Sequence, residues 1–128
     1  MELSRSFDEK KPIYLQVRDR LEDMIMKGQL KEGDQAPSTT EMASFYKINH
    51  ITVGKGVSQL VDEGVLYKRR GIGMFVAEGA REKLRKNRTR TFVIDYIHPM
   101  IDEAEKLGLS NEEILQKINE VLGSDKDE

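Results

Sequence analysis

The chain of 128 residues contains no cysteine, which excludes disulfide bonds and zinc sites built on thiolates. It has only two histidines, His50 and His98, and neither has a second histidine at helical spacing, so the sequence indicates no metal site. A serine, histidine and aspartate arrangement, a phosphate-binding glycine loop and paired catalytic carboxylates are also missing. We therefore expect a protein that is not an enzyme and needs no cofactor.

Long apolar runs are missing as well. No stretch approaches the roughly eighteen consecutive apolar residues of a membrane span, and the first residues lack the pattern of a signal peptide. The composition, 38% apolar and 34% charged, still allows a hydrophobic core. These features predict one small cytoplasmic domain with at most a short appendage, and no association with a membrane.

The formal net charge of −2 conceals an uneven distribution along the chain. Residues 1–78 carry twelve basic and twelve acidic side chains, and residues 79–90 carry six basic and one acidic. Residues 91–128 reverse the sign, with three basic and ten acidic side chains. Because an acidic tail offsets a cationic middle, the overall charge is a poor guide to the partners of this protein.

Three helices are predicted in the first half of the chain. The first begins after Pro12 and ends before Gly28, because its apolar residues recur at helical spacing. Ser38 and Glu41 form a capping box that opens a short second helix, which runs to about Tyr46. A break of about four residues separates it from a third helix, which Gly64 ends, and two helices joined in this way are typical of a helix-turn-helix. The residues expected on the buried faces of the first and third helices are Ile13, Val17, Leu21, Met24, Ile25, Val53, Val57, Leu60 and Val61.

A small hairpin is predicted next. Two β-prone runs, residues 65–68 and 74–76, flank a basic loop that contains two glycines. The order of helix, helix-turn-helix and hairpin predicts an α+β fold, mostly α, with an N-terminal winged helix-turn-helix over residues 12–78. Residues 1–11 show no periodicity and are expected to form a flexible leader.

Residues 79–123 are predicted to form a basic linker and a two-helix tail. Pro99 interrupts the first apolar stripe of the tail, so we expect a bend near residues 95–99. Ser110 and Glu113 form a second capping box, and residues 124–128 are expected to be a frayed acidic end. The two apolar stripes are too large to cover only each other, which predicts a homodimer formed by the tail. The residues assigned to dimerisation are Val93, Tyr96, Ile97, Met100, Ile101, Ala104, Ile114, Ile118 and Leu122.

Several short motifs occur in a characteristic order at characteristic spacings. They are Pro12-Ile13-Tyr14 with Gln16, Gly28, Gly33-Asp34, Pro37-Ser38 with Glu41, Asn49 with Thr52-Val53, Glu63-Gly64, and Arg70-Gly71 with Gly73 and Phe75-Val76. With this set, residues 12–77 resemble the GntR family of bacterial transcription regulators. The tail, with Glu103-Ala104 and Leu107-Gly108-Leu109-Ser110, resembles the short-tailed YtrA-like subfamily.

The resemblance implies a sequence-specific regulator of transcription that binds a double-stranded DNA operator. It further implies a repressor that acts as a homodimer on a pseudo-palindromic site, often beside a transporter operon. Carried over residue by residue, it assigns DNA contacts to the start of the second helix, to the third helix and to the hairpin. The candidates are Ser38, Thr40, Asn49, His50, Thr52, Lys55, Arg69, Arg70 and Gly71.

Three positions depart from the family pattern. Thr40 replaces a usual arginine, and Gly54 replaces an arginine or glutamine of the reading face. Gly56 replaces a small alanine, and two glycines inside one helix are expected to cost about 1 kcal/mol each relative to alanine. These changes predict either weaker or altered base readout, or a recognition helix that becomes ordered only on binding.

Two further interpretations remain open at this point. The balanced charge of residues 1–78 and the missing arginines also fit a winged helix that serves as a protein-protein interaction module. A small-molecule effector of unknown identity could bind a small pocket between the tail helices and the winged helix, lined by Phe92, Tyr96 and Met100, although such a stripe is more often core or dimer contact.

Overall fold

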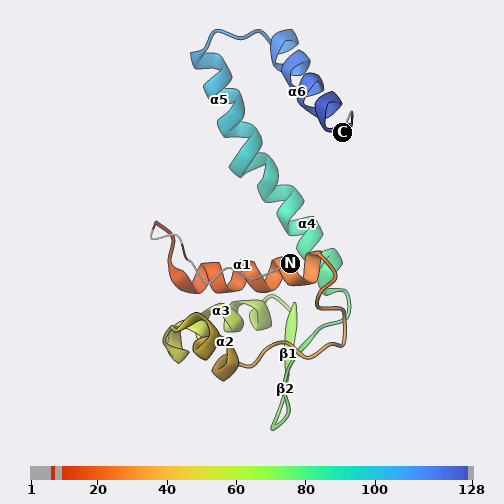
Figure 1. Ribbon diagram of the computed structural model, residues 1–128. Helices are drawn as coiled ribbons and strands as arrows, with labels where there is room; N and C mark the ends of the chain where they lie inside the picture. Colours follow the sequence, from red (N-terminus) through yellow and green to blue (C-terminus); the bar gives the residue numbers. More distant parts are fainter. Residues whose placement is uncertain (1–6, 8–9, 127–128) are drawn as a thin grey trace. The chain divides into compact units, whose positions relative to one another are not determined.

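The computed structural model describes Phe7 and residues 10–126, which fall into two compact units divided between Asn87 and Arg88. Helices dominate, with one small antiparallel sheet in the first unit, so the predicted class and the N-terminal winged helix are confirmed (Figure 1). The elements are α1 Ile13–Met26, α2 Thr39–Tyr46, α3 His50–Asp62, β1 Leu66–Arg69, β2 Gly73–Val76, α4 Ala80–Phe92, the π-helical η1 Val93–Ile97, α5 His98–Lys106 and α6 Asn111–Lys126.

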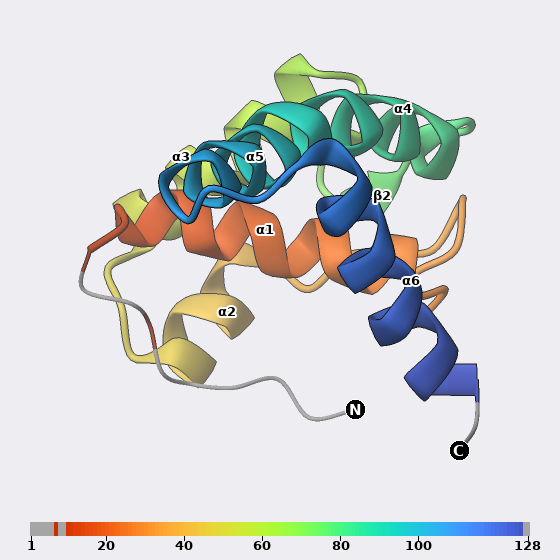
Figure 2. The same cartoon turned by 90° about the horizontal axis from the view of Figure 1, so that it is seen from above.

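The three N-terminal helices form the layer that carries the core of the first unit. Seen from above, α1 runs across this unit with α2 to one side, and α3 packs against both helices (Figure 2). Most of the predicted apolar stripes of α1 and α3 are buried, but Ile13 is 40% exposed and Met24 and Val61 are half-buried. The largest fully buried side chains are Ile25, Leu60, Leu66, Leu84, Val17, Val53, Val65 and Val76.

The boundaries of α2 and α3 follow from local hydrogen bonds. The Ser38 hydroxyl accepts from the Glu41 N–H at 3.0 Å, and a Glu41 carboxylate oxygen accepts from the Ser38 N–H at 3.1 Å, which confirms the capping box. Lys47 then adopts a left-handed conformation with φ 56° and ends α2. Asn49 caps α3, so the turn between the two helices is short, as predicted.

The hairpin of β1 and β2 projects from the helical layer (Figure 1). Leu66 lies opposite Val76, and Arg69 lies opposite Gly73 at the turn. The segment of residues 33–36 pairs with the other edge of β2, which the sequence did not predict. The Ala36 N–H donates to the Met74 carbonyl at 2.8 Å, and the Val76 N–H donates to the Asp34 carbonyl at 2.9 Å. The base of the wing is therefore held on both edges of β2.

The core of the first unit extends beyond residue 78, where the predicted winged-helix segment ends. Ala80 and Leu84, in the first turns of α4, are 0% and 1% exposed. These two residues lie one helical turn apart on a helix that is otherwise rich in cations, so they give it one apolar edge. The beginning of the predicted linker is therefore part of the folded domain.

The second unit consists of the end of α4, η1, α5 and α6. Where a bend was predicted near Pro99, residues Val93–Ile97 form the π-helical turn η1, in which the His98 N–H donates to the Val93 carbonyl. The second capping box is confirmed, with both Ser110–Glu113 hydrogen bonds at 3.1 Å. Helix α6 continues to Lys126, into the segment that was expected to fray, and residues 127–128 lie outside the described part of the chain.

Most of the predicted leader also lies outside the described part, apart from Phe7, Lys10 and Lys11. The Phe7 ring packs edge-on against Tyr46, with 5.3 Å between ring centroids. Among the helices that the structure describes, none has both the length and the apolar character required to cross a membrane.

Candidate nucleic-acid interface

The first turn of α3 presents three of the predicted contact residues. Asn49 and His50 are exposed, and Thr52 is half-buried. The Asn49 side-chain oxygen accepts the Ile51 N–H at 2.7 Å, so this residue already serves as the helix cap. Any DNA contact by Asn49 must therefore use the amide nitrogen or the remaining acceptor capacity of the side chain.

The face of α3 that points away from the core holds Ile51, Gly54, Lys55 and Ser58, at helical spacing. We call these four residues the α3 ridge. Lys55, predicted to contact DNA, extends toward α1, where its ammonium nitrogen lies 5.5 Å from the centroid of the Tyr14 ring. Ile51 is 72% exposed and was not among the predicted site residues. The sequence did contain a signal for Ile51. Its position relative to the buried residues Val53 and Val57 places it on the opposite face of the helix, away from the core.

A groove of about 460 Å³ brings together three segments that are distant in sequence. Ser38 and Thr39 reach it from the start of α2, Gly54 and Ser58 from α3, and Lys68 from the wing. The Ser38 hydroxyl faces its own helix as the cap, and Thr40 is exposed on the same turn. A helix N-terminus favours anions, so the start of α2 and the cation of Lys68 suit a phosphodiester backbone, whereas Asp62 adds a negative charge to the same groove.

The predicted DNA-contact residues of the wing are exposed to solvent. Arg69, Arg70 and Gly71 are all exposed, and the Arg69 guanidinium carbon lies 5.2 Å from the centroid of the Phe75 ring. Gly71 has φ 77° and Gly73 has φ 144°. Residues other than glycine rarely adopt these conformations, which allow the tight turn at the tip of the wing. The wing therefore offers two cationic side chains on a narrow backbone.

Gln35 supports this tip and was not predicted from the sequence. Its side-chain amide donates to the Ile72 carbonyl at 3.1 Å, and a Cβ at Gly73 would lie 2.6 Å from the same nitrogen. The contact joins residues 37 positions apart, so no local sequence signal reports it. Gln35 thus fixes the tip of the wing relative to the strand-like segment that precedes α2.

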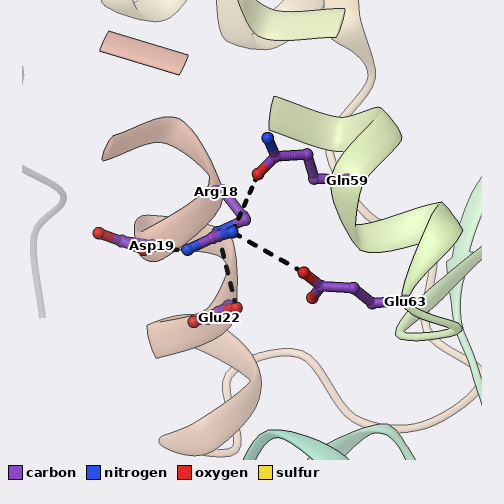
Figure 3. A network of polar contacts seen from close by, with 5 residues as sticks. All are labelled: Arg18, Asp19, Glu22, Gln59 and Glu63. Carbon is purple, nitrogen blue, oxygen red and sulfur yellow. Dashed lines mark hydrogen bonds and ion pairs between the residues drawn. The ribbon is translucent and has the colours of Figure 1, made fainter. Parts of the chain in front are cut away.

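Arg18 links α1 to α3 through a network of polar contacts (Figure 3). Its guanidinium donates to the Gln59 side-chain oxygen at 2.9 Å and lies 3.8 Å from a carboxylate oxygen of Glu63. Gln59 belongs to α3, and Glu63 caps its C-terminal end. Asp19 and Glu22 approach from its own helix, at 3.6 and 3.9 Å. The network ties the C-terminal half of α3 to α1 and therefore helps to set the orientation of the ridge.

The cations of α4 are exposed, but at least one is paired within the helix. Arg85 makes two hydrogen bonds to the Glu82 carboxylate, at 2.6 and 3.0 Å. These bonds hold the pKa of Glu82 below its ordinary value. Within the described residues, no group of three or more acidic, histidine or cysteine side chains is placed to hold a metal ion.

The second unit contains an apolar groove of about 470 Å³ between α5 and α6, which we call the tail groove. Ala104 and Ile114, predicted as dimer contacts, are already buried within a single chain, at 6% and 8% exposure. They are covered because both face the groove, where α5 and α6 meet. The other predicted dimerisation residues keep exposed or half-buried side chains, and they are Val93, Tyr96, Ile97, Met100, Ile101, Ile118 and Leu122.

The three residues suggested for an effector pocket do not share one surface feature. The rings of Phe92 and Tyr96 lie 5.8 Å apart, and both side chains are at least half exposed. Met100 instead lines the tail groove.

Comparison with known proteins adds a family and several relatives. The family described as "Bacterial regulatory proteins, gntR family" matches residues 13–76, from the start of α1 to the end of β2. The HTH-type transcriptional repressor YtrA of Bacillus subtilis (strain 168) is 30% identical over 110 residues, which cover 86% of this chain and 84% of that protein.

Solved structures agree with this assignment. The crystal structure of a GntR-family regulator from Bacteroides thetaiotaomicron has a TM-score of 0.74 and 34% identity, over 88% of this chain and 98% of that chain. The DNA-binding domain of AraR, solved in complex with the operator ORR3, has a TM-score of 0.52 and 28% identity, over 60% of this chain and 90% of that chain. These proteins regulate transcription and are not enzymes, in agreement with the expectation from the sequence.

Proposed function

This chain belongs to the gntR family of bacterial regulatory proteins, and we propose that it represses transcription as a homodimer bound to a pseudo-palindromic operator. The observation that carries the DNA-binding part is the convergence on one groove of the start of α2, two residues of the α3 ridge, Gly54 and Ser58, and the wing. An α-helix fits the major groove of B-form DNA, and a narrow glycine-bearing turn can approach the backbone or the minor groove. The structure thus supplies both elements from a single surface.

Charge on this surface supports contact with phosphates. Lys68, Arg69 and Arg70 are consecutive and exposed in the wing, although residues 1–78 are neutral as a whole. Such cations supply affinity that does not depend on base sequence, whereas contacts in the groove supply specificity. We therefore assign general affinity mainly to the wing and sequence preference mainly to α3.

The tail groove supports the homodimer. Met100, Leu107 and Leu122 are 39%, 65% and 54% exposed, although all three line the same apolar groove. A second copy of the chain would bury this surface through a two-fold interface. Two symmetric winged helices would then bind two half-sites, which accounts for a pseudo-palindromic operator.

The repressor assignment and the target genes follow from the family rather than from the geometry. YtrA of Bacillus subtilis is a repressor, and we extend that role to this chain. We further propose that the controlled genes include a transporter operon, as the resemblance to the YtrA-like subfamily implies. Deletion of the gene is then expected to raise the transcription of neighbouring transporter genes, measured by RNA sequencing.

The dimer is tested by sedimentation equilibrium of the full chain. We expect a dimer for the unmodified protein and monomers for Met100→Glu and Leu122→Glu, because each places a carboxylate in the interface. Leu115→Glu is the matched control, since Leu115 is 61% exposed on another face of α6 and is expected to leave the dimer intact. A monomeric unmodified chain, or dissociation by Leu115→Glu alone, would overturn this interface.

DNA binding is tested by the dependence of affinity on salt. If the first unit binds phosphates, its affinity for random duplex DNA falls steeply as the salt concentration rises. Affinity that is absent or independent of salt would instead favour a protein-protein interaction module.

A further inference from the structure

Ile51 has an exposure that the fold itself does not explain. Among the large apolar side chains that the structure describes, none is more exposed than Ile51 at 72%. It occupies the first turn of α3, where its N–H is held by the Asn49 side chain at 2.7 Å. A β-branched side chain in a helix keeps essentially one rotamer. Its methyl groups are therefore presented to the outside at a defined position and lose little conformational entropy on contact.

No other member of the α3 ridge places a large side chain beside Ile51. Gly54 lies one turn further along, and a Cβ built on it would meet no atom within 4 Å. Lys55 is turned toward the Tyr14 ring, and Ser58 has only a short side chain. The ridge therefore presents a projecting apolar group beside a hollow, where a long hydrogen-bond donor would otherwise be expected.

This shape corresponds to one feature of the major groove. Thymine is the base that carries a methyl group on its major-groove edge, and apolar side chains recognise it by direct contact. We propose that Ile51 contacts the 5-methyl group of a thymine and so selects a T·A pair at one position of each half-site. The proposal rests on the proposed function, because it requires that α3 enters the major groove.

Replacement of thymine by deoxyuridine tests this contact, because it removes the methyl group and leaves the base pairing unchanged. The preferred duplex is first obtained by selection from random sequences, and each thymine is then replaced singly. We expect one position in each half-site at which deoxyuridine weakens binding of the unmodified protein about fourfold, the effect of one buried carbon group. Ile51→Ala is expected to bind the duplex with thymine at that position and the duplex with deoxyuridine there with equal affinity.

Two variants serve as controls. Ile72→Ala removes another exposed isoleucine, 55% exposed in the wing, and is expected to retain the sensitivity to deoxyuridine. Ile51→Val keeps a β-branched side chain and is expected to retain part of the sensitivity to deoxyuridine. Since Ile51 is exposed, Ile51→Ala is expected to unfold at the same temperature or slightly higher, and to keep the same salt dependence of binding.

The outcomes separate this proposal from the function on which it rests. Equal sensitivity to deoxyuridine in the unmodified protein and in Ile51→Ala would overturn the assignment of Ile51. A sequence preference without any sensitive thymine would also overturn it and would leave the proposed function standing. Equal binding of all duplexes would overturn both.

Discussion

Gly56 of α3 lies directly against the main-chain carbonyl of Tyr14 in α1. A Cβ at position 56 would be 2.5 Å from that oxygen and 3.3 Å from the main-chain nitrogen of Arg18, so no larger residue fits without movement of the backbone. The glycine lowers helix propensity, as expected from the sequence, but it also lets α3 approach α1 closely. Gly54, two residues earlier, has open space around it. The two glycines of this helix therefore have different physical roles.

Alanine substitutions should separate these roles. Gly54→Ala is expected to raise the free energy of unfolding by about 0.5–1 kcal/mol, because it adds helix propensity in open space. Gly56→Ala is expected to lower it by about 1–3 kcal/mol, because the added methyl group overpacks the contact with α1. Urea denaturation of both variants measures the difference. Equal effects of the two substitutions would contradict this account of the helix contact.

The Arg18 network should show energetic coupling between its members. Arg18→Met keeps an apolar stem but removes the charge beside Glu22, whose side chain is 11% exposed, and it removes the donor to Gln59. We expect a loss of about 1–3 kcal/mol in the free energy of unfolding. Glu22→Gln should reduce this loss when it is combined with Arg18→Met, and a double-mutant cycle measures the coupling.

Asp19→Asn provides the control for the Arg18 network. Asp19 lies 3.6 Å from Arg18 but is 42% exposed, so its pairing is expected to contribute at most about 1 kcal/mol. Additive effects of Arg18→Met and Glu22→Gln would show that the two residues do not stabilise the fold as a pair.

Leu84 should stabilise the first unit although it lies beyond the predicted winged-helix segment. Because Leu84 is 1% exposed, Leu84→Ala in the full chain is expected to lower the free energy of unfolding by about 2–5 kcal/mol. Leu115→Ala is the matched control, since that leucine is 61% exposed and its loss is expected to change stability by about 0.5 kcal/mol or less. Similar losses in denaturation experiments on the two variants would argue against a role of α4 in the core.

The wing should supply affinity without sequence preference. Arg70→Ala is expected to weaken binding to the selected operator and to a scrambled duplex by the same factor, and to lower the salt slope by about 1. Lys106→Ala, which removes an exposed cation from the tail, is expected to leave both quantities unchanged. Fluorescence anisotropy across a salt series measures the slopes. If Arg70→Ala affects the operator only, this arginine reads a base and our assignment is wrong.

The second capping box should make the start of α6 sensitive to acid. Hydrogen bonds from the backbone and the side chain of Ser110 hold the pKa of Glu113 below its ordinary value of 4.5. Because the pKa of Glu113 is lowered in the folded state, its carboxylate stabilises the helix start at pH values above the ordinary pKa. This stabilisation is lost as the pH falls through the pKa of the folded state. Glu113→Gln is therefore expected to remove this part of the acid dependence, measured by amide exchange at the first turn of α6.

Glu112→Gln is the control for this pH experiment. It changes the neighbouring carboxylate and leaves the capping box in place, so the acid dependence at the start of α6 should persist. An unchanged pH profile in Glu113→Gln would show that the capping carboxylate does not control this helix end.

The sequence was sufficient wherever the responsible interaction spans a few residues. Both capping boxes, the apolar stripes of α1 and α3 and the glycine turn of the wing were predicted, because their hydrogen bonds and periodicities are local. The same local signals, in their order along the chain, also indicated the family and predicted the helix-turn-helix and the wing, from which residues of α2, α3 and the hairpin line one groove.

Tertiary structure alone decided which of these residues are available and what surrounds them. It turned Lys55 toward Tyr14, left Ile51 exposed on the ridge and placed Gln35 beneath the wing tip. Local sequence signals miss such contacts, because they join helices and strands whose separation depends on the packing of the whole core. Gly56 shows this most clearly, since its lost helix propensity can be read from the sequence, while its contact with α1 depends on how closely the two helices pack.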